Sequence, residues 1–231
     1  MILPKTPATD TMPRRKILSA IYALHDKWAD AFEYACHKGC ATCCTRSVTM
    51  TTLEGELIHE YITGQRADLI PQRAALTLDS PAPAMTTNQF AAACLRGEEV
   101  AEPPGAWDLA PCLFLRDGCC AIYPARPFMC RGFGSRVRCD LRGEAEIAPL
   151  LLTLNTVIMQ CLEHLDQGRP WGNMQLILRG VAADAAGEQA IPTGGLALAR
   201  PLPGFLLLPE EETDLAEQLR TLMRLCHIPS A

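Results

Sequence analysis

The stretch CHKGCATCC (residues 36–44) sets the first constraint on the fold. It places four cysteines, Cys36, Cys40, Cys43 and Cys44, within nine residues. Thiols this close together are either oxidised to one another or bound to a shared partner. Loops can fold several thiolates around one centre, and we expect this stretch to be such a loop.

The N-terminal segment bears on the redox state of these thiols. MILPKTPATDTMPRRKIL (residues 1–18) has no apolar run ahead of a small-residue cleavage site, so it does not have the form of a secretory signal. We therefore expect a cytoplasmic protein. In that compartment thiols stay reduced, and clustered cysteines are metal ligands or redox groups more often than disulfides. A disulfide framework is the less favoured alternative.

Composition narrows the class of protein. A chain of 231 residues with 48% hydrophobic and 20% charged residues is typical of a globular protein with one sizeable core. The longest apolar run, IAPLLLTLNTVIMQCL (residues 147–162), is too short and too polar to span a bilayer, so we expect no membrane partner. The net charge of −5 disfavours nucleic acid as a partner, because phosphate binding requires a basic surface.

Apolar periodicity predicts several helices. Residues 17–32 and 147–165 carry apolar side chains at three- and four-residue spacing. Residues 51–61 begin with Thr51 and Glu54, which can form a capping box at a helix start. We expect two further helices, over residues 88–97 and from residue 209 to 226.

One β-hairpin is predicted. In CLFLRDGCCAIY (residues 112–123) two short β-prone runs flank Asp117-Gly118, a dipeptide typical of tight hairpin turns. PARPFMCRGFG (residues 124–134) then indicates a turn and a short helix. We find no alternation of strands and helices of the kind that a parallel sheet needs. The fold class we expect is mostly α: a single helical domain with one small β-hairpin and cysteine-rich loops around a metal centre.

Charge and cysteine content change near residue 143. From Cys112 to Arg142 there are six arginines and two acidic residues, whereas from Gly143 onward there are five basic and eleven acidic residues. Ten of the twelve cysteines precede residue 143. We therefore predict a cysteine-cluster metal-binding region with an N-terminal helix in residues 1–142. Residues 143–231 are predicted to form a helical scaffold packed on it in the same globular unit.

The twelve cysteines are of two kinds. Cys94, Cys161 and Cys226 lie on the apolar stripes of predicted helices and are expected to pack in the core as small hydrophobes. The other nine lie in turns, loops and the hairpin, where thiolates can bind zinc or an iron–sulfur cluster. These predicted metal ligands are Cys36, Cys40, Cys43, Cys44, Cys112, Cys119, Cys120, Cys130 and Cys139.

Arginines near these cysteines can compensate the charge of a metal centre. Four thiolates around Zn²⁺ or around an oxidised 4Fe–4S core leave a net negative charge, which is costly to bury alone. Arg126 and Arg131 flank Cys130, and we predict that both neutralise the bound cofactor. Arg136 and Arg138 fit surface positions equally well.

Two segments carry a family resemblance. CHKGCATCC and PCLFLRDGCCAIYPARPFMCRGF resemble the two halves of the CxxCxxCC cysteine-cluster family, a YkgJ-like zinc- or iron-chelating domain. The likeness covers roughly residues 36–139. Two features depart from the family pattern: three residues instead of two separate Cys36 from Cys40, and Cys119 is an additional thiol. The second half of the pattern is matched by Cys112, Phe114, Leu115, Cys120, Ile122, Tyr123, Arg126, Pro127, Cys130 and Arg131.

The resemblance implies metal or cluster binding, and kinship with the cluster region of flagellin lysine-N-methylase. It does not by itself imply an activity. The hypothesis we favour is a cytosolic iron–sulfur protein with a redox, sensing or accessory enzymatic role. Nine loop thiols exceed the four that one 4Fe–4S cluster needs, which favours a larger cluster, a second one, or one cluster with an exchangeable ligand. The sequence does not identify a redox or protein partner.

Two alternatives stay open. The first is a structural zinc protein with one or two four-cysteine sites, although the vicinal pair Cys43-Cys44 is awkward for one tetrahedral ion. The second is a cluster-dependent enzyme that uses S-adenosylmethionine, because Cys36-x3-Cys40-x2-Cys43 has the spacing of that signature. The second alternative is disfavoured because a helix, and not a strand, is predicted before Cys36.

Overall fold

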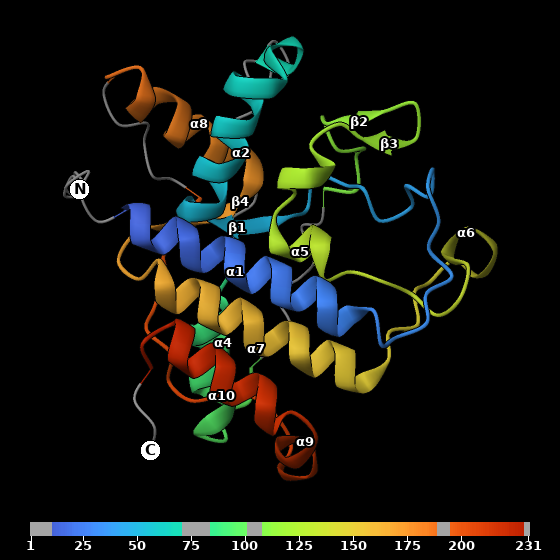
Figure 1. Cartoon of the computed structure of the whole chain (residues 1–231), viewed down its shortest axis with the longest axis vertical. Coiled ribbons are helices and arrows are strands. Elements are labelled where there is room, and N and C mark those ends of the chain that lie inside the picture. Colours follow the sequence, from blue (N-terminus) through green and yellow to red (C-terminus); the bar gives the residue numbers. More distant parts are fainter. Residues whose placement is uncertain (1–10, 71–83, 101–107, 189–194, 229–231) are drawn as a thin grey trace.

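The computed structural model describes residues 11–70, 84–100, 108–188 and 195–228. About half of the chain is helical, and two small antiparallel sheets accompany the helices (Figure 1). Its elements are α1 (Thr11–Ala29), β1 (Thr49–Thr51), α2 (Thr52–Gln65), η2 (Ala67–Leu69), α4 (Thr87–Leu95), β2 (Leu115–Arg116), β3 (Cys119–Cys120), η3 (Tyr123–Ala125), α5 (Phe128–Arg131), α6 (Cys139–Arg142), α7 (Pro149–Leu165), β4 (Pro170–Asn173), α8 (Met174–Ala185), β5 (Leu196–Leu198), α9 (Pro209–Asp214) and α10 (Ala216–Leu225).

The main core lies between α1, α7 and α10. In Figure 1, α1 and α7 run alongside each other and α10 packs against α7. The apolar stripe predicted over residues 147–165 faces this core, and Leu154, Val157 and Ile158 are buried there. Burying a side chain of this size stabilises a fold by about 1.5–3 kcal/mol. Cys161 of α7 and Cys226 after α10 are buried in the same core, as predicted.

The predicted helix starts and the hairpin turn are confirmed. Thr51 caps α2 and forms the expected capping box with Glu54. Asp117 and Gly118 both have positive φ, 47° and 72°, as a two-residue turn of type I′ requires. The helix expected from residue 209 is instead broken at Leu215 into α9 and α10.

A three-stranded antiparallel sheet adds to the single predicted hairpin, so that prediction was incomplete. Its strand order is β1-β4-β5, and β1 and β5 have only three residues each. The central strand begins with Pro170 and contains Gly172, both of which disfavour a strand in isolation. Pairing with partners far away in the chain therefore creates this sheet.

Helices α2 and α8 cover the sheet and pack closely on each other. Their approach depends on Gly55, because a Cβ there would lie 2.6 Å from Cγ2 of Ile177. Within the ranges given above, no helix is long and apolar enough to cross a membrane.

Candidate metal centre

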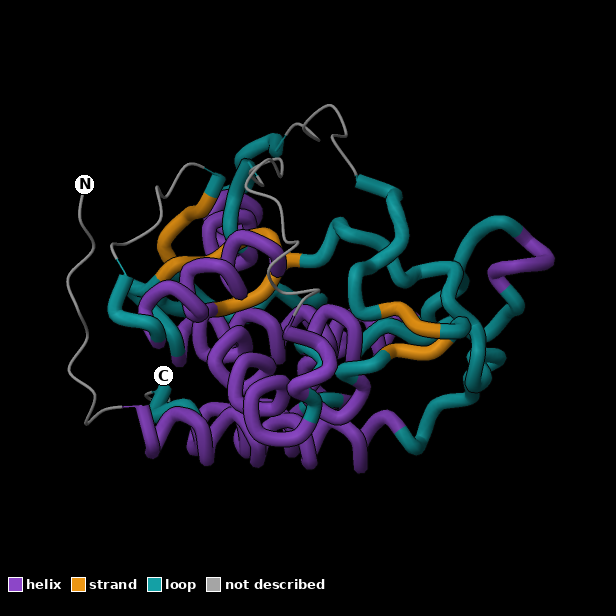
Figure 2. Tube along the Cα trace, turned by 90° about the horizontal axis from the view of Figure 1, so that it is seen from above, coloured by secondary structure: helices purple, strands orange, loops and turns teal. Residues whose placement is uncertain are grey.

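The cysteine-rich segments lie together at one end of the molecule. In Figures 1 and 2 the loop after α1, the β2–β3 hairpin and α6 extend from the helical body on the same side, and α5 lies between them and that body. The backbone N–H of Cys112 donates to the carbonyl of Cys44 at 2.9 Å, and Thr45 forms a β-bridge with Pro111. The two cysteine-rich regions of the sequence, residues 36–44 and 112–139, are therefore neighbours in space.

Three thiols in this region are partly covered by the protein. Cys112, Cys120 and Cys130 pack against the apolar cluster that includes Phe114 and Ile122. Burial raises the pKa of all three thiols, and the pKa of Cys130 is raised further by its thiol neighbours Cys112 and Cys120. Without a bound cation these thiols retain their protons. A metal cation that binds the sulfurs displaces those protons.

The vicinal cysteines lie next to this group. A hydrogen bond between the two thiols lowers the pKa of Cys44 and raises that of Cys43. Cys44 also interacts electrostatically with Cys120, Cys130 and Cys112. Five of the nine predicted ligands thus influence one another's charge.

The other four predicted ligands lie in the loop after α1, in β3 and at the start of α6. The Cys36 sulfur accepts the N–H of Ser135 at 3.3 Å. The Cys139 thiol lies 3.9 Å from the carbonyl oxygen of Val137, toward which it donates. The Cys40 N–H closes a tight turn onto a carbonyl three residues earlier, and Cys119 lies in β3.

The thiols do not form a finished coordination sphere. In the part of the chain that the structure describes, no group of three or more His, Cys, Asp or Glu side chains is arranged to hold a metal ion. The fold therefore brings the two cysteine regions together, but the described sulfurs are not arranged as a coordination sphere.

The two predicted charge-compensating arginines have different surroundings. The Arg126 guanidinium lies over the Tyr123 ring, 3.6 Å from its centroid, and burial lowers the pKa of this arginine. The Arg131 side chain is only 8% exposed and forms an ion pair with Asp26 of α1 at 2.8 Å. Its Nε is buried without a hydrogen-bond partner among the described residues. Arg131 directly follows Cys130 in the sequence.

The two remaining arginines of the segment have exposed partners. Arg136 pairs with Glu146, and Arg138 pairs with Asp140. All four side chains are about half exposed, so these pairs contribute little to stability. Their ion pairs match the surface role that the sequence left open for them.

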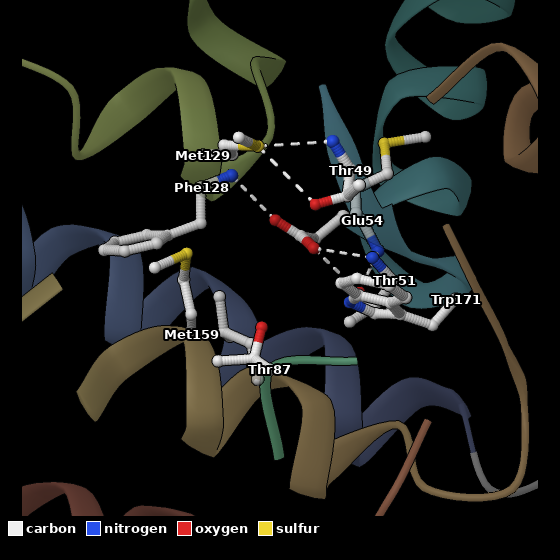
Figure 3. Close-up of a pocket in the computed structure, with 10 residues that line it drawn as sticks. Thr49, Thr51, Glu54, Thr87, Phe128, Met129, Met159 and Trp171 are labelled. Carbon is white, nitrogen blue, oxygen red and sulfur yellow. Dashed lines mark hydrogen bonds between the residues drawn. The ribbon is translucent and has the colours of Figure 1, made fainter. Parts of the chain in front are cut away.

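A buried carboxylate holds the segment that carries Cys130. Glu54 is 3% exposed and its Oε1 accepts the N–H of Phe128 at 2.7 Å and the Tyr22 hydroxyl at 2.8 Å. Its Oε2 accepts the N–H and the hydroxyl of Thr51, both at 2.9 Å (Figure 3). Sequence reasoning identified Glu54 only as a helix cap, because its contact with α5 joins residues far apart in the chain.

A small cavity lies beside this carboxylate. Figure 3 shows Met129 and Met159 on one side of it and Trp171 on the other. The Met129 sulfur accepts the N–H of Thr49 at 3.2 Å. The cavity has room for about one water molecule.

Comparison with known proteins adds no identification. No family model, no curated protein and no solved structure matches this chain.

Proposed function

We propose that this chain is a cytosolic metal-binding protein that holds an iron–sulfur cluster through its clustered cysteine thiolates. The observation that carries the proposal is the hydrogen bond from Cys112 N–H to the Cys44 carbonyl. It holds the two cysteine-rich regions together before any metal is considered. A redox, sensing or accessory enzymatic role follows from the chemistry of such a cluster.

The donor set fits the proposed cofactor. Thiolate sulfur is the usual ligand of iron–sulfur clusters, and five thiols gather beside the hairpin. Arg126 acts electrostatically on Cys120 and Cys130, so its charge can compensate that of a bound cluster. The resemblance to the CxxCxxCC family is in keeping with this assignment.

Metal binding and local folding are coupled in this proposal. The sulfurs are not arranged for coordination, but they lie on loops and on short elements. Sites of this kind seldom exist preformed, and the free energy of metal binding closes them. We therefore expect the cysteine-rich end to become ordered when the cofactor binds, while the α1–α7–α10 core is already folded.

The fold gives little support to the alternative of an enzyme that uses S-adenosylmethionine. The strands in the described ranges pair only in antiparallel fashion, whereas that alternative needs a parallel barrel around its cosubstrate. The cysteine loop also follows α1, which is a helix.

Metal analysis of the intact chain tests the proposal. The protein is purified without oxygen, and iron, acid-labile sulfide and zinc are measured on one sample together with an absorption spectrum. Iron with matching sulfide and a broad visible charge-transfer band is the expected result. Zinc with a colourless solution would instead indicate the structural zinc alternative.

Matched serine variants locate the cofactor. We expect Cys120→Ser and Cys130→Ser to lose iron and sulfide, because both thiols belong to the proposed ligand set. Cys226→Ser should keep the full metal content, because this cysteine is buried in the α7–α10 core. A Cys226→Ser protein that folds but contains no iron would contradict the assignment.

A further inference from the structure

Two cysteines lie apart from the candidate metal centre. Among the cysteines that the structure describes, Cys161 and Cys226 are the buried ones, with 0% and 4% of their surface exposed. Both belong to the main core, Cys161 on α7 and Cys226 directly after α10, which packs against α7 (Figure 1). No predicted metal ligand belongs to this described core cluster. The proposed iron–sulfur centre therefore gives these two thiols no role.

The two thiols are in contact with each other. A hydrogen bond joins the Cys161 thiol to that of Cys226, and this bond and burial raise the pKa of Cys161. The side chains around the pair are aliphatic, among them Leu162 of α7 and Leu222 of α10. A buried cysteine packs like a small hydrophobe, but it keeps the reactivity of its sulfur. Contact between two thiols from different helices is the first requirement of a disulfide.

A capping turn fixes the position of Cys226. The N–H of Ile228 donates to the carbonyl of Met223 at 2.9 Å, and the N–H of His227 donates at 3.4 Å to the carbonyl three residues earlier. This pair of bonds is the Schellman motif that ends many helices. Ile228 also packs against the main core. The motif thus holds Cys226, the last residue before the turn, against α7.

The same turn provides access to the buried pair. His227 has a φ of 55°, a left-handed conformation that glycine usually occupies in this motif. Because that conformation is unfavourable for a residue with a Cβ, opening of the last turn of α10 relieves strain. Helix ends open locally far more often than the whole protein unfolds. Such an opening exposes Cys226, whereas Cys161 lies inside α7.

We propose that Cys161 and Cys226 are a modification site: a hydrogen peroxide molecule converts them into a disulfide that joins α7 to the end of α10. The Cys226 sulfur attacks one peroxide oxygen and the O–O bond breaks, which leaves a sulfenic acid on Cys226. The departing hydroxide takes the proton of the Cys226 thiol and leaves as water. The Cys161 sulfur then attacks the Cys226 sulfur, the S–O bond breaks, and the second hydroxide leaves as water with the Cys161 proton.

The reaction balances without any metal. Two thiols and one peroxide become one disulfide and two water molecules, and the two electrons lost by the sulfurs reduce the peroxide. The inference therefore goes beyond the proposed function and does not depend on it. A disulfide between distant residues restricts the unfolded chain more than the folded one, so the oxidised protein should be the more stable form. We expect the midpoint of thermal unfolding to rise by about 5–15 °C.

Peptide mapping of the full-length chain tests the pair directly. The folded protein is treated with hydrogen peroxide, the remaining thiols are alkylated in denaturant, and trypsin is added without reductant. Cleavage after Arg142, Arg179 and Arg224 places Cys161 and Cys226 on two peptides that each contain no other cysteine. We expect one cross-linked species that is two hydrogens lighter than the two peptides together and that dithiothreitol separates.

Two alanine variants serve as matched controls. In Cys161→Ala the sulfenic acid on Cys226 has no partner thiol, so it should accumulate and react with dimedone. Cys226→Ala should give neither a cross-link nor a dimedone adduct on Cys161. Neither variant should gain thermal stability under the peroxide treatment that stabilises the parent chain. Circular dichroism of each variant shows whether the helical core has folded.

A glycine variant tests the route of access. His227→Gly removes the strain of the left-handed position and makes opening of the helix end rarer. The cross-link should therefore form about three- to tenfold more slowly than in the parent chain. An unchanged rate would show that the peroxide does not enter through this turn.

The outcomes keep the two proposals apart. The disulfide is refuted if both peptides are recovered singly, with alkylated thiols, from a sample whose loop cysteines are oxidised. It is also refuted if the cross-link forms in urea but not in the folded chain. A chain that binds iron and forms no cross-link leaves the proposed function intact. A chain without iron that forms the cross-link supports the disulfide and refutes the iron–sulfur proposal.

Discussion

Replacing Glu54 by glutamine probes the carboxylate that joins three elements of the fold. The substitution keeps the size of the side chain and removes its charge. All four groups that contact the carboxylate are donors: the N–H groups of Phe128 and Thr51 and the hydroxyls of Tyr22 and Thr51. A glutamine has one acceptor oxygen, and its NH₂ group must face two of these donors.

The structure sets the size of the effect. The hydroxyls can rotate and accept from the new NH₂ group, but one backbone N–H, of Phe128 or of Thr51, is left without an acceptor. An unsatisfied buried donor costs about 1–3 kcal/mol, and hydrogen bonds to a charged acceptor contribute about 1.5–3 kcal/mol. We expect the free energy of unfolding to fall by roughly 2–4 kcal/mol, which lowers the midpoint temperature by about 5–15 °C for a chain of this length.

Chemical and thermal unfolding followed by circular dichroism measure this loss. Glu60→Gln is the matched control, because Glu60 lies on the same helix α2 and its side chain is 63% exposed in a surface ion pair with Arg15. That pair should contribute no more than about 1 kcal/mol. If Glu54→Gln destabilises the protein no more than Glu60→Gln does, the carboxylate is not the structural link inferred here.

Three further predictions follow from individual contacts. Gly55→Ala should cost about 1–3 kcal/mol of unfolding free energy, because the new methyl group collides with Ile177. The control Gly64→Ala in the same helix should raise the free energy of unfolding by about 0.5–1 kcal/mol, because a Cβ there meets nothing within 4 Å. If urea unfolding shows equal effects for the two alanine variants, the close approach of α2 and α8 is refuted. The Nε2 of His25 lies 3.0 Å from the Asn155 amide oxygen, and burial lowers the pKa of this histidine. The stability that neutral His25 contributes is therefore present above the unfolded pKa of about 6.5. It is lost as the pH falls below that value, because the unfolded chain then takes up a proton more readily than the folded one. In the His25→Gln variant the urea midpoint should decrease less steeply as the pH is lowered below about 6.5. An unchanged dependence on pH would show that His25 does not cause this decrease.

Local signals in the sequence determined much of the helical fold. The Thr51–Glu54 capping box, the Asp117-Gly118 turn and the apolar stripe of α7 each act over a few residues, and each is present where predicted. In such elements the stabilising contacts join residues that are neighbours in the chain. Their residue types and spacing therefore carry the information.

The sequence also singled out the nine loop cysteines, since their position outside helical stripes is a property of the chain itself. What it did not provide was their grouping. Whether a hairpin thiol packs against the apolar cluster depends on which strand residues are paired: Cys120, opposite Leu115, packs there, whereas Cys119 lies opposite Arg116. A shift of one residue in that register would exchange the two sides.

Tertiary structure alone decided the features that join distant segments. The β1-β4-β5 sheet forms although β4 contains Pro170 and Gly172, because β1, more than a hundred residues earlier in the chain, and β5 supply its hydrogen bonds. Glu54 has a second role only because Phe128 is folded against it, and Arg131 finds Asp26 across the interface of α5 with α1. The amino-acid sequence thus determined the helices and the hairpin turn through local contacts. Long-range packing determined which of them meet, since the free energy of those contacts depends on partners that no local pattern identifies.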